Sequence, residues 1–410
     1  MEQFLEKAKN ASRVLSTMGG SERNRILREM AEALRANTMN IIEANATDMR
    51  NAEANALAAS MKERLLLDEK RIEAMAVAIE EIAALKDPVG RVLEGWVTEA
   101  GLKIEKVSIP IGVVGIIYES RPNVTSDTAA LCFKSANGCV LKGGKEAEAS
   151  NAAIAEALQG VLVRNDLPAE LVALLPDSSR EGVAKLIRME KYVDLIVPRG
   201  GEGLIHYVSQ NATVPVVKHD KGLCHTYIDR AANIESAIEI ALNAKVQRPG
   251  VCNSMETLLV DRSIAPSVLP LLKEAFERAH TQLKGCDQTR EWIEVEKASE
   301  EDFDTEYLAN ILNIRVVDGV EGAISHIVRF GSGHSEAIIT ENITTAERFL
   351  DAIDAAAVYV NASTRFTDGG AFGFGAEVGI STNKLHARGP MGVEGLTTYK
   401  YKIYGKGQIR

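Results

Sequence analysis

Cys252 is the residue whose setting most favours covalent chemistry. It lies in the segment RPGVCNSMETLLV, where Pro249 and Gly250 end a helical pattern and a strand-like run begins two or three residues after the cysteine. Functional side chains concentrate in such loops between rigid elements. A thiol held there can attack a carbonyl carbon while its own backbone N–H is directed at the carbonyl oxygen. The alternative is a small loop or core residue, because buried cysteines are mostly inert.

Asn123 is the second candidate. It follows Pro122 in YESRPNVTSD, directly after an apolar run, so we expect it in a turn at the carboxyl end of a strand. Ligands of open α/β sheets bind at that edge. A side-chain amide is a good oxyanion donor because it carries no charge to desolvate and does not titrate. A turn asparagine that bonds its own backbone is the alternative interpretation.

Two glycine pairs could approach a phosphate. The segments VLKGGKEAEASNAAIAEAL and VPRGGEGLIHYV each run from a strand through Gly143–Gly144 or Gly200–Gly201 into a helix. This arrangement lets backbone N–H groups meet an anion at a helix N-terminus. Neither segment matches GxGxxG, and glycine pairs also serve simply to turn the chain.

The elements that position these residues begin with a helical segment of about ninety residues, in which Ile72, Met75, Ile79 and Ile82 recur at helical spacing. Residues 91–109 predict a hairpin around a turn at residues 99–101. Short apolar runs separated by helices then predict a buried parallel sheet. These runs are IGVVGIIYE, CVLK, ELVALLP, VDLIVP and VPVV.

A second alternating set predicts a second α/β unit. It comprises a helix over residues 234–246 and the strand-like runs METLLV, ILNIRVV and AAAVYV. The alternation returns in LTTYKYKIYG, which we expect to pair with the hairpin or with the sheet of another subunit.

Composition limits the class of protein. A chain of 410 residues is long enough for about two or three domains. Its formal net charge of -10, without a basic stripe, disfavours nucleic-acid binding, and no uncharged run is long enough to span a bilayer. Five cysteines without disulfide or CxxC metal spacing predict reduced thiols, no metal site and a cytoplasmic location.

Taken together, these segments resemble the aldehyde dehydrogenase superfamily and, within it, the reductases that act on an acyl phosphate of glutamate. The likeness covers essentially the whole chain. Its most specific stretches are GVVGIIYESRPNVTSD, VLKGGKEA, VPRGGEGLI, VVKHDKGLCH, RPGVCNSMETLLV, TEYLA, GSGHSEAI, NASTRFTDGG, KLHARGPMG and LTTYKY.

The resemblance implies an aldehyde dehydrogenase-like α/β fold with two parallel-sheet domains and an oligomerisation flap built from the β-hairpin and the C-terminal strand. The implied boundaries are residues 1–90 and 110–222 for a cofactor-binding domain, 223–385 for a catalytic domain, and 91–109 and 386–410 for the flap.

The resemblance also implies roles for individual residues. Cys252 would be the nucleophile, and Asn123 with the Cys252 backbone amide would form the oxyanion site. The implied cofactor contacts are Lys142, Gly200, Gly201 and Glu306. Recognition of a substrate α-carboxylate would fall to arginines in the matching motifs, although each of these could instead form a structural ion pair. They are Arg121, Arg365 and Arg388.

One departure from the wider superfamily is informative. Members that release a free acid carry a glutamate base in a Glu-Leu-Gly-Gly segment, and the matching stretch here reads VKHDKG, residues 217–222. Without a group to activate water, a thioester survives until hydride or phosphate resolves it. Lys218 and His219 offer positive or donor character suited to a phosphate group.

The resemblance therefore implies NADPH-dependent reduction of L-γ-glutamyl 5-phosphate to L-glutamate 5-semialdehyde and phosphate, in proline biosynthesis. Preference for NADPH is inferred from Lys145, because NAD-preferring relatives commonly carry a glutamate there. The expected partners are further copies of the chain in a homo-oligomer and, transiently, a separate glutamate kinase. The alternatives are a hydrolytic or CoA-acylating aldehyde dehydrogenase, or an inactive scaffold of the same fold.

Overall fold

The computed structural model describes residues 1–217 and 221–410 and divides into two compact units. Unit 1 comprises Met1–Lys218, Gly373–Gly379 and Pro390–Arg410, and unit 2 comprises His219–Phe372 and Ile380–Gly389. Residues 373–379 therefore group with unit 1, whereas the sequence analysis placed them in the second domain. The chain packs this segment against the helices of unit 1, where Gly375 lies beside Leu85.

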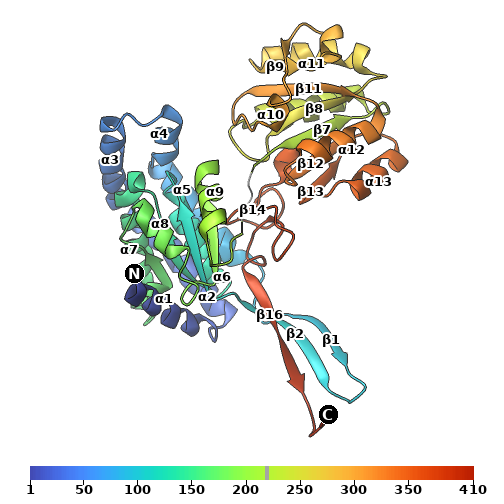
Figure 1. Cartoon of the computed structure of the whole chain (residues 1–410). Coiled ribbons are helices and arrows are strands. Elements are labelled where there is room, and N and C mark those ends of the chain that lie inside the picture. Colours follow the sequence, from blue (N-terminus) through green and yellow to red (C-terminus); the bar gives the residue numbers. More distant parts are fainter. Residues whose placement is uncertain (218–220) are drawn as a thin grey trace. The chain divides into compact units, whose positions relative to one another are not determined.

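Unit 1 begins with the expected helical segment and continues into a parallel sheet (Figure 1). Its first helices are α1 (Glu2–Leu15), α2 (Gly20–Ala36), α3 (Thr38–Ala54), α4 (Ala59–Leu65) and α5 (Glu69–Ala84). Ile72, Met75, Ile79 and Ile82 lie buried on one face of α5, which confirms the periodicity. Asp68 caps this helix by accepting a hydrogen bond from the Arg71 backbone N–H.

The sheet of unit 1 has the strand order β5-β4-β3-β6 and all of its pairs are parallel. Its strands are β3 (Val113–Tyr118), β4 (Gly138–Lys142), β5 (Val172–Leu174) and β6 (Leu195–Arg199). The connecting helices are α6 (Asn123–Lys134), η1 (Lys145–Ala147), α7 (Glu148–Arg164), η2 (Ala169–Leu171), α8 (Arg180–Leu186) and α9 (Glu202–Asn211). Because α6 leads from β3 to one side and β6 lies on the other, the strand order reverses beside β3.

Lys134 joins α6 to the first helices although its side chain is buried. Its ammonium donates to Asn24 Oδ1 at 2.6 Å, to the Ala83 carbonyl at 2.9 Å and to the Leu85 carbonyl at 2.5 Å. Burial lowers the pKa of Lys134 to about 8, with the charge of Asp87 opposing that shift. All three donors of the ammonium are thus satisfied, as a buried polar group requires.

Two expectations for unit 1 need correction. The run VPVV forms only a single bridge, between Val216 and Ile196, and no strand. Pro215 in this run has no N–H to donate, which prevents a continuous ladder. Asn123 was expected in a turn, but it is the first residue of α6.

The expected hairpin is present as β1 (Val92–Val97) and β2 (Lys103–Pro110), and β16 (Thr397–Tyr404) pairs antiparallel with β2 (Figure 1). Every residue of β1 is exposed, and so is nearly all of β16. The ring centroids of Trp96 and Tyr401 lie 6.0 Å apart across the sheet in an edge-to-face arrangement. Pairing with the hairpin, one of the two partners considered for LTTYKYKIYG, is thus observed within the chain.

Unit 2 contains a parallel sheet in the order β10-β9-β11-β8-β7-β12-β13. Its strands are β7 (Cys224–Ile228), β8 (Met255–Asp261), β9 (Gln282–Gly285), β10 (Glu296–Lys297), β11 (Ile311–Val317), β12 (Ser335–Ile339) and β13 (Ala357–Val360). Its helices are α10 (Ile234–Val246), α11 (Ala265–Arg278), η3 (Thr289–Glu291), η4 (Asp302–Asp304), α12 (Gly319–Phe330), α13 (Ile343–Ala352) and η5 (Thr364–Phe366). A two-stranded ladder joins β14 (Ile380–Ser381) and β15 (Gly389–Pro390).

Helices cover both faces of this sheet. Leu258 and Val260 of β8 pack in one apolar cluster with α10 and α11, whereas Leu259 packs in another with α12 and α13. Successive side chains of a strand point to opposite faces, so a strand covered on both sides must be apolar throughout. Leu258, Leu259 and Val260 meet this requirement, whereas Glu256 near the start of the strand is buried in an ion pair with Lys245; the run METLLV forms a strand, as predicted. In the described part of the chain, no helix is long and apolar enough to cross a membrane.

Candidate active site

Cys252 lies in a tight turn between α10 and β8, at the amino ends of the parallel strands of unit 2. The Ser254 N–H closes the turn on the Val251 carbonyl at 3.0 Å, and Cys252 is partly exposed. Strand β8 begins three residues after the cysteine, as predicted. Cys252 therefore lies in a hydrogen-bonded corner of the chain, and the residue is partly accessible to solvent.

Asn253, which follows Cys252, links the turn to the segment around η5 by hydrogen bonds. Asn253 is buried, and its side-chain Nδ2 donates to the Thr367 carbonyl at 2.7 Å and to the Arg365 carbonyl at 3.4 Å. In return, Thr364 Oγ1 donates to the Asn253 carbonyl at 2.8 Å. These bonds link two segments more than a hundred residues apart and hold Arg365 beside the turn.

Arg365 is the arginine of the three candidates that unit 2 places near the nucleophile. Its Nε donates to Gln247 Oε1 at 2.7 Å. Burial lowers the pKa of Arg365 and the neighbouring Arg248 adds to this, while Asp368, Cys252 and Cys224 oppose it. A guanidinium with an ordered partner beside the thiol is suited to hold a substrate carboxylate.

Arg388 has a different setting. It donates to Asp354 Oδ1 at 2.7 Å and to the Asp354 carbonyl at 3.2 Å, and Lys384 also pairs with Asp354. This is the structural ion pair that the sequence analysis gave as the alternative. Arg121 follows β3 in unit 1, so it lies in a different unit from Cys252.

Glu306 lies in the segment before β11 and so at the same edge of the unit 2 sheet as Cys252. Its charge acts on a buried pair formed by Lys245 and Glu256. Burial raises the pKa of Glu256 to about 7; Lys245 opposes the shift and Glu306 adds to it. Unit 2 thus brings together Cys252, Arg365 and Glu306.

In unit 1, Asn123 opens α6 just after the carboxyl end of β3. It is exposed, and its Nδ2 donates to Asp127 Oδ2 at 2.9 Å, one helical turn further along. Burial raises the pKa of Asp127 to about 6, while hydrogen bonds from Asn123 and Ser126 and the charge of Arg199 oppose the shift. The bond orients the amide, and the second N–H of the amide is geometrically available for a ligand.

Both glycine pairs also lie at the carboxyl ends of strands in unit 1, and each runs into a helix as predicted. At Gly201, the backbone N–H donates to Glu119 Oε2 at 2.8 Å, so a carboxylate caps the N-terminus of α9. A β-carbon on Gly200 would come within 2.6 Å of the same oxygen. At this corner, which lies at the strand-order reversal beside β3, the Gly201 N–H is thus occupied by Glu119, and a phosphate group would bind there only by displacing that carboxylate.

The two candidate lysines of unit 1 differ in setting. Lys142 is buried at the end of β4, and its Nζ donates to the Ser178 carbonyl at 2.7 Å. Burial lowers its pKa, with Glu146, Asp177 and Glu119 opposing the shift. Lys145 is exposed at the start of η1. Lys218 and His219 lie outside the described residues.

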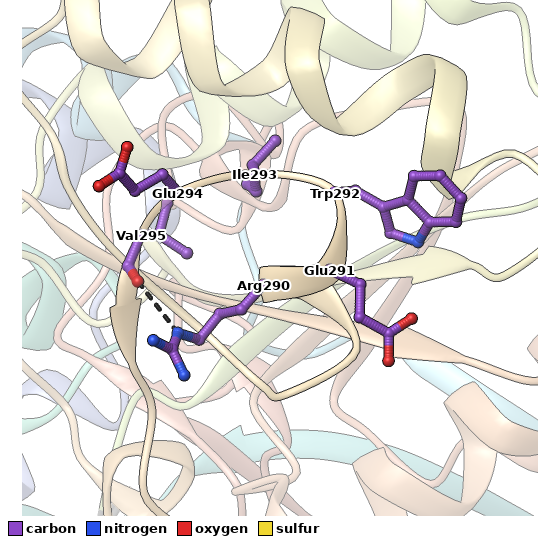
Figure 2. Close-up of a pocket in the computed structure, with 6 residues that line it drawn as sticks. All are labelled: Arg290, Glu291, Trp292, Ile293, Glu294 and Val295. Atoms are coloured by element: carbon purple, nitrogen blue, oxygen red, sulfur yellow. Dashed lines mark hydrogen bonds between the residues drawn. The ribbon is translucent and has the colours of Figure 1, made fainter.

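A surface concavity of about 280 Å³ lies elsewhere in unit 2 (Figure 2). It is formed by residues 290–295 in the connection from β9 to β10, where Arg290 Nε donates to the Val295 carbonyl at 3.2 Å. Strand β11 separates β9 from β8, and none of the candidate residues lines this hollow. Among residues 1–217 and 221–410, no group of three or more His, Cys, Asp or Glu side chains could hold a metal ion.

Comparison with known proteins gives concordant results. Residues 1–290 match the model of the aldehyde dehydrogenase family. The γ-glutamyl phosphate reductases of Sulfurovum sp. (strain NBC37-1) and Sulfurimonas denitrificans are 77% and 74% identical to this chain, each over 100% of both chains. The crystal structure of the γ-glutamyl phosphate reductase of Thermotoga maritima superposes with a TM-score of 0.97 at 46% identity, covering 100% of this chain and 99% of that one.

Proposed function

The chain belongs to the aldehyde dehydrogenase family and, within it, to the γ-glutamyl phosphate reductases, and from this premise we propose that it reduces L-γ-glutamyl 5-phosphate with NADPH through a thioester on Cys252. As an enzyme of this family it is an oxidoreductase with a role in proline biosynthesis, and it uses a nicotinamide cofactor. The thioester, the choice of NADPH and the roles of individual residues are the proposal.

The observation that carries the proposal is the setting of Cys252. The thiol lies in a partly exposed turn that is tied through Asn253 to the segment bearing Arg365. In the reaction, its thiolate attacks the acyl carbon of the substrate and phosphate departs. The Cys252 backbone N–H and the Asn123 amide are proposed to hold the oxyanion. Such stabilisation of developing charge is usually the largest single contribution to lowering the activation barrier.

Arg365 is proposed to hold the α-carboxylate of the substrate. Its Nε donates to Gln247 Oε1, and the proposed contacts with the carboxylate are made by the terminal nitrogens of the guanidinium. Arg121 and Arg388 are kept as weaker candidates, because the former lies in unit 1 and the latter pairs with Asp354. Lys218 and His219 are proposed to face the departing phosphate.

The cofactor is proposed to bind along the carboxyl edge of the unit 1 sheet. Gly200 and Gly201 at the N-terminus of α9 would meet its phosphates, with Lys142 and the exposed Lys145 nearby in sequence and Glu306 contributed by unit 2. When bound, the cofactor supplies the hydride that releases the thioester as glutamate 5-semialdehyde. The three-part division into cofactor domain, catalytic domain and flap, and the assembly of subunits through the flap, belong to the same proposal.

The test is oxidation of glutamate 5-semialdehyde in the reverse direction, measured with and without inorganic phosphate and with each nicotinamide cofactor. We expect reduction of NADP to depend on phosphate and to be abolished by Cys252→Ala, while cofactor binding and the circular dichroism spectrum are retained. Cys286→Ala is the matched control, since Cys286 is the other partly exposed cysteine of the described residues.

Two outcomes would contradict the proposal. Oxidation that proceeds equally well without phosphate would indicate a hydrolytic enzyme, and dependence on coenzyme A would indicate an acylating one. Retention of roughly a tenth of the wild-type rate by Cys252→Ala would exclude the thioester.

A further inference from the structure

A second cysteine lies directly behind the turn that carries Cys252. Cys224 is the first residue of β7 and is fully buried, and its Sγ donates to the Cys252 carbonyl oxygen at 3.2 Å. The proposed reaction makes no use of this thiol. It lies next to the partly exposed cysteine that we propose as the nucleophile, so the chemistry open to the two thiols together can be considered.

The backbone at Gly222 packs directly against the backbone of Cys252. A β-carbon built on Gly222, two residues before Cys224, would lie 2.1 Å from the Cys252 carbonyl oxygen and 2.5 Å from the Cys252 Cα atom. With the 3.2 Å contact from Cys224 Sγ to the Cys252 carbonyl oxygen, covalent geometry limits the separation of the two cysteine Cα atoms to about 8.5 Å. This upper limit includes the roughly 4.4–6.8 Å between Cα atoms that disulfides span, and formation of the bond requires the turn to bring Cys252 Sγ against Cys224 Sγ.

We infer that Cys224 is the resolving thiol for Cys252, so that oxidation of Cys252 by a peroxide ends in an internal Cys224–Cys252 disulfide. This inference rests on the proposed role of Cys252 as a reactive thiolate. Nothing in it requires the substrate or the cofactor to be bound.

The chemistry takes two balanced steps. The Cys252 thiolate attacks one oxygen of hydrogen peroxide and the O–O bond breaks, giving Cys252 sulfenic acid and hydroxide; sulfur is oxidised by two electrons. The Cys224 sulfur then attacks the Cys252 sulfur, the S–O bond breaks, and the oxygen leaves as water with the proton of the Cys224 thiol. Two thiols and one peroxide thus give one disulfide and two waters.

The surroundings assign the two cysteines to different steps. Burial, with the charges of Glu336 and Cys252 adding to it, raises the pKa of Cys224 well above its usual range, so this thiol stays protonated and does not react with peroxide itself. His334 Nδ1 lies 3.7 Å from Cys224 Sγ and 2.9 Å from Ser335 Oγ, so the Cys224 thiol is enclosed by polar groups of the chain while its proton leaves with the departing oxygen. Cys252 is the accessible partner of the pair.

The consequence is protection of the nucleophile. A sulfenic acid that is not captured proceeds to the sulfinic acid, which thiol reductants do not reverse, whereas a disulfide returns to two thiols on addition of dithiothreitol. Oxidised enzyme would be inactive but recoverable.

The experiment treats the full-length wild-type protein with hydrogen peroxide and follows intact mass, non-reduced peptide maps and activity. We expect a loss of two hydrogens in mass, a single linked peptide pair containing Cys224 and Cys252, and recovery of activity with dithiothreitol. Cys224→Ser keeps a hydroxyl donor for the Cys252 carbonyl but cannot form the bond, so the fraction of activity recovered should fall by roughly tenfold. Cys286→Ser should recover like the wild type.

Absence of the linked peptide pair from oxidised wild type overturns the inference, and so does full recovery of Cys224→Ser. The wild-type peptide map decides the question even if Cys224→Ser fails to fold. The map also separates the two claims: activity that survives Cys252→Ala would remove the thioester mechanism while a linked pair still stands, and an inactive Cys252→Ala without a linked pair would remove only the resolving role of Cys224.

Discussion

Lys245 and Glu256 form an ion pair that is closed off from solvent: the Lys245 Nζ atom lies 2.7 Å from Glu256 Oε2, and the two side chains are 0% and 1% exposed. Lys245 belongs to the last turn of α10 and Glu256 to the start of β8, so the pair closes the base of the loop that carries Cys252.

Lys245→Met should destabilise unit 2 because it leaves the Glu256 carboxyl buried without its partner. Breaking a buried pair from one side typically costs about 3–5 kcal/mol, whereas replacing both partners with apolar residues is often nearly neutral. Urea denaturation of Lys245→Met, Glu256→Leu and the double variant measures the coupling. A double variant that is no more stable than either single variant would mean that the pair does not act as a unit.

Asn123→Ala should lower kcat by about 10²–10³ with a smaller change in KM, the usual cost of one oxyanion donor. Asp127 orients this amide, so its protonation should weaken the alignment. Because the pKa of Asp127 is raised to about 6, the rate should fall as pH falls through about 6. Asp127→Asn cannot titrate, and its pH–rate profile should lack this acid limb. An effect of Asn123→Ala confined to KM would assign the residue to binding alone.

Lys145→Glu should weaken NADPH far more than NADH. Lys145 is exposed at the start of η1, three residues after Lys142, and a charge-assisted contact of about 1.5–3 kcal/mol with a 2′-phosphate corresponds to roughly a 10-fold to 100-fold preference. Lys70→Glu makes the same charge change at an exposed position on α5 and should leave the preference unaltered. Equal losses of kcat/KM for both cofactors in Lys145→Glu would show that this lysine does not read the 2′-phosphate.

Trp96→Lys and Tyr401→Lys should dissociate the protein into smaller species in light scattering. These rings meet on a three-stranded sheet whose outer strands are exposed, and unpaired edges with apolar side chains are typical of interaction surfaces. Trp292→Lys is the control, because Trp292 is a comparably exposed ring in unit 2. A wild-type protein that is monomeric at micromolar concentration would remove the flap from consideration as an interface.

His326→Phe should make the protein less sensitive to acid. Burial lowers the pKa of His326 to about 2, and the charges of His225, Arg315 and Arg329 add to this shift. Neither ring nitrogen has a hydrogen-bond partner, and the ring packs against Phe303 and Phe330. The side chain therefore stays neutral in the folded state while the unfolded chain takes up a proton below about pH 6.5.

The direction of the pH dependence of stability follows from this difference in proton binding between the folded and unfolded states. The stability associated with His326 is fully present above about pH 6.5 and is lost progressively below it, by about 2 kcal/mol at pH 5. Unfolding free energies measured at pH 7.5 and pH 5 should therefore differ less in His326→Phe than in wild type. His206→Phe, at an exposed position on α9, should keep the wild-type difference; an unchanged difference in His326→Phe would refute the assignment.

The sequence alone was sufficient where local pattern decides structure. The face of α5, the hairpin, the strands β3, β4, β6, β8, β11 and β13 and the two glycine corners follow from periodicity and turn chemistry. Strands β7 and β12 were missed because each has a buried polar residue at its second position, His225 or Glu336, and these side chains are compatible with a core only because they bond each other at 2.9 Å. Such a pair is 111 positions apart in the chain and leaves no local signal.

The contacts of the candidate site also fall into those that local spacing predicts and those that only the folded structure shows. The bond from Asn123 to Asp127 spans one helical turn. It could have been predicted from the i, i+4 spacing if the start of α6 had been placed at Asn123. The carboxylate of Glu119 on the Gly201 N–H, the anchoring of Asn253 on Thr367 and the contact from Cys224 to Cys252 depend on tertiary pairing. No spacing rule in a single sequence reports them.

The partner strand of β2 comes late in the chain, after all the strands of the unit 2 sheet: Glu105 of β2 and Tyr404 of β16 are 299 positions apart. Domains emerge from the ribosome in order, at about 5–20 residues per second, so β1 and β2 are outside for about 15–60 seconds before β16 follows. During that time one side of β2 is an open edge, available to any neighbouring extended chain. On a crowded polysome, the nascent chain is therefore most exposed to mispairing while unit 2 is being translated.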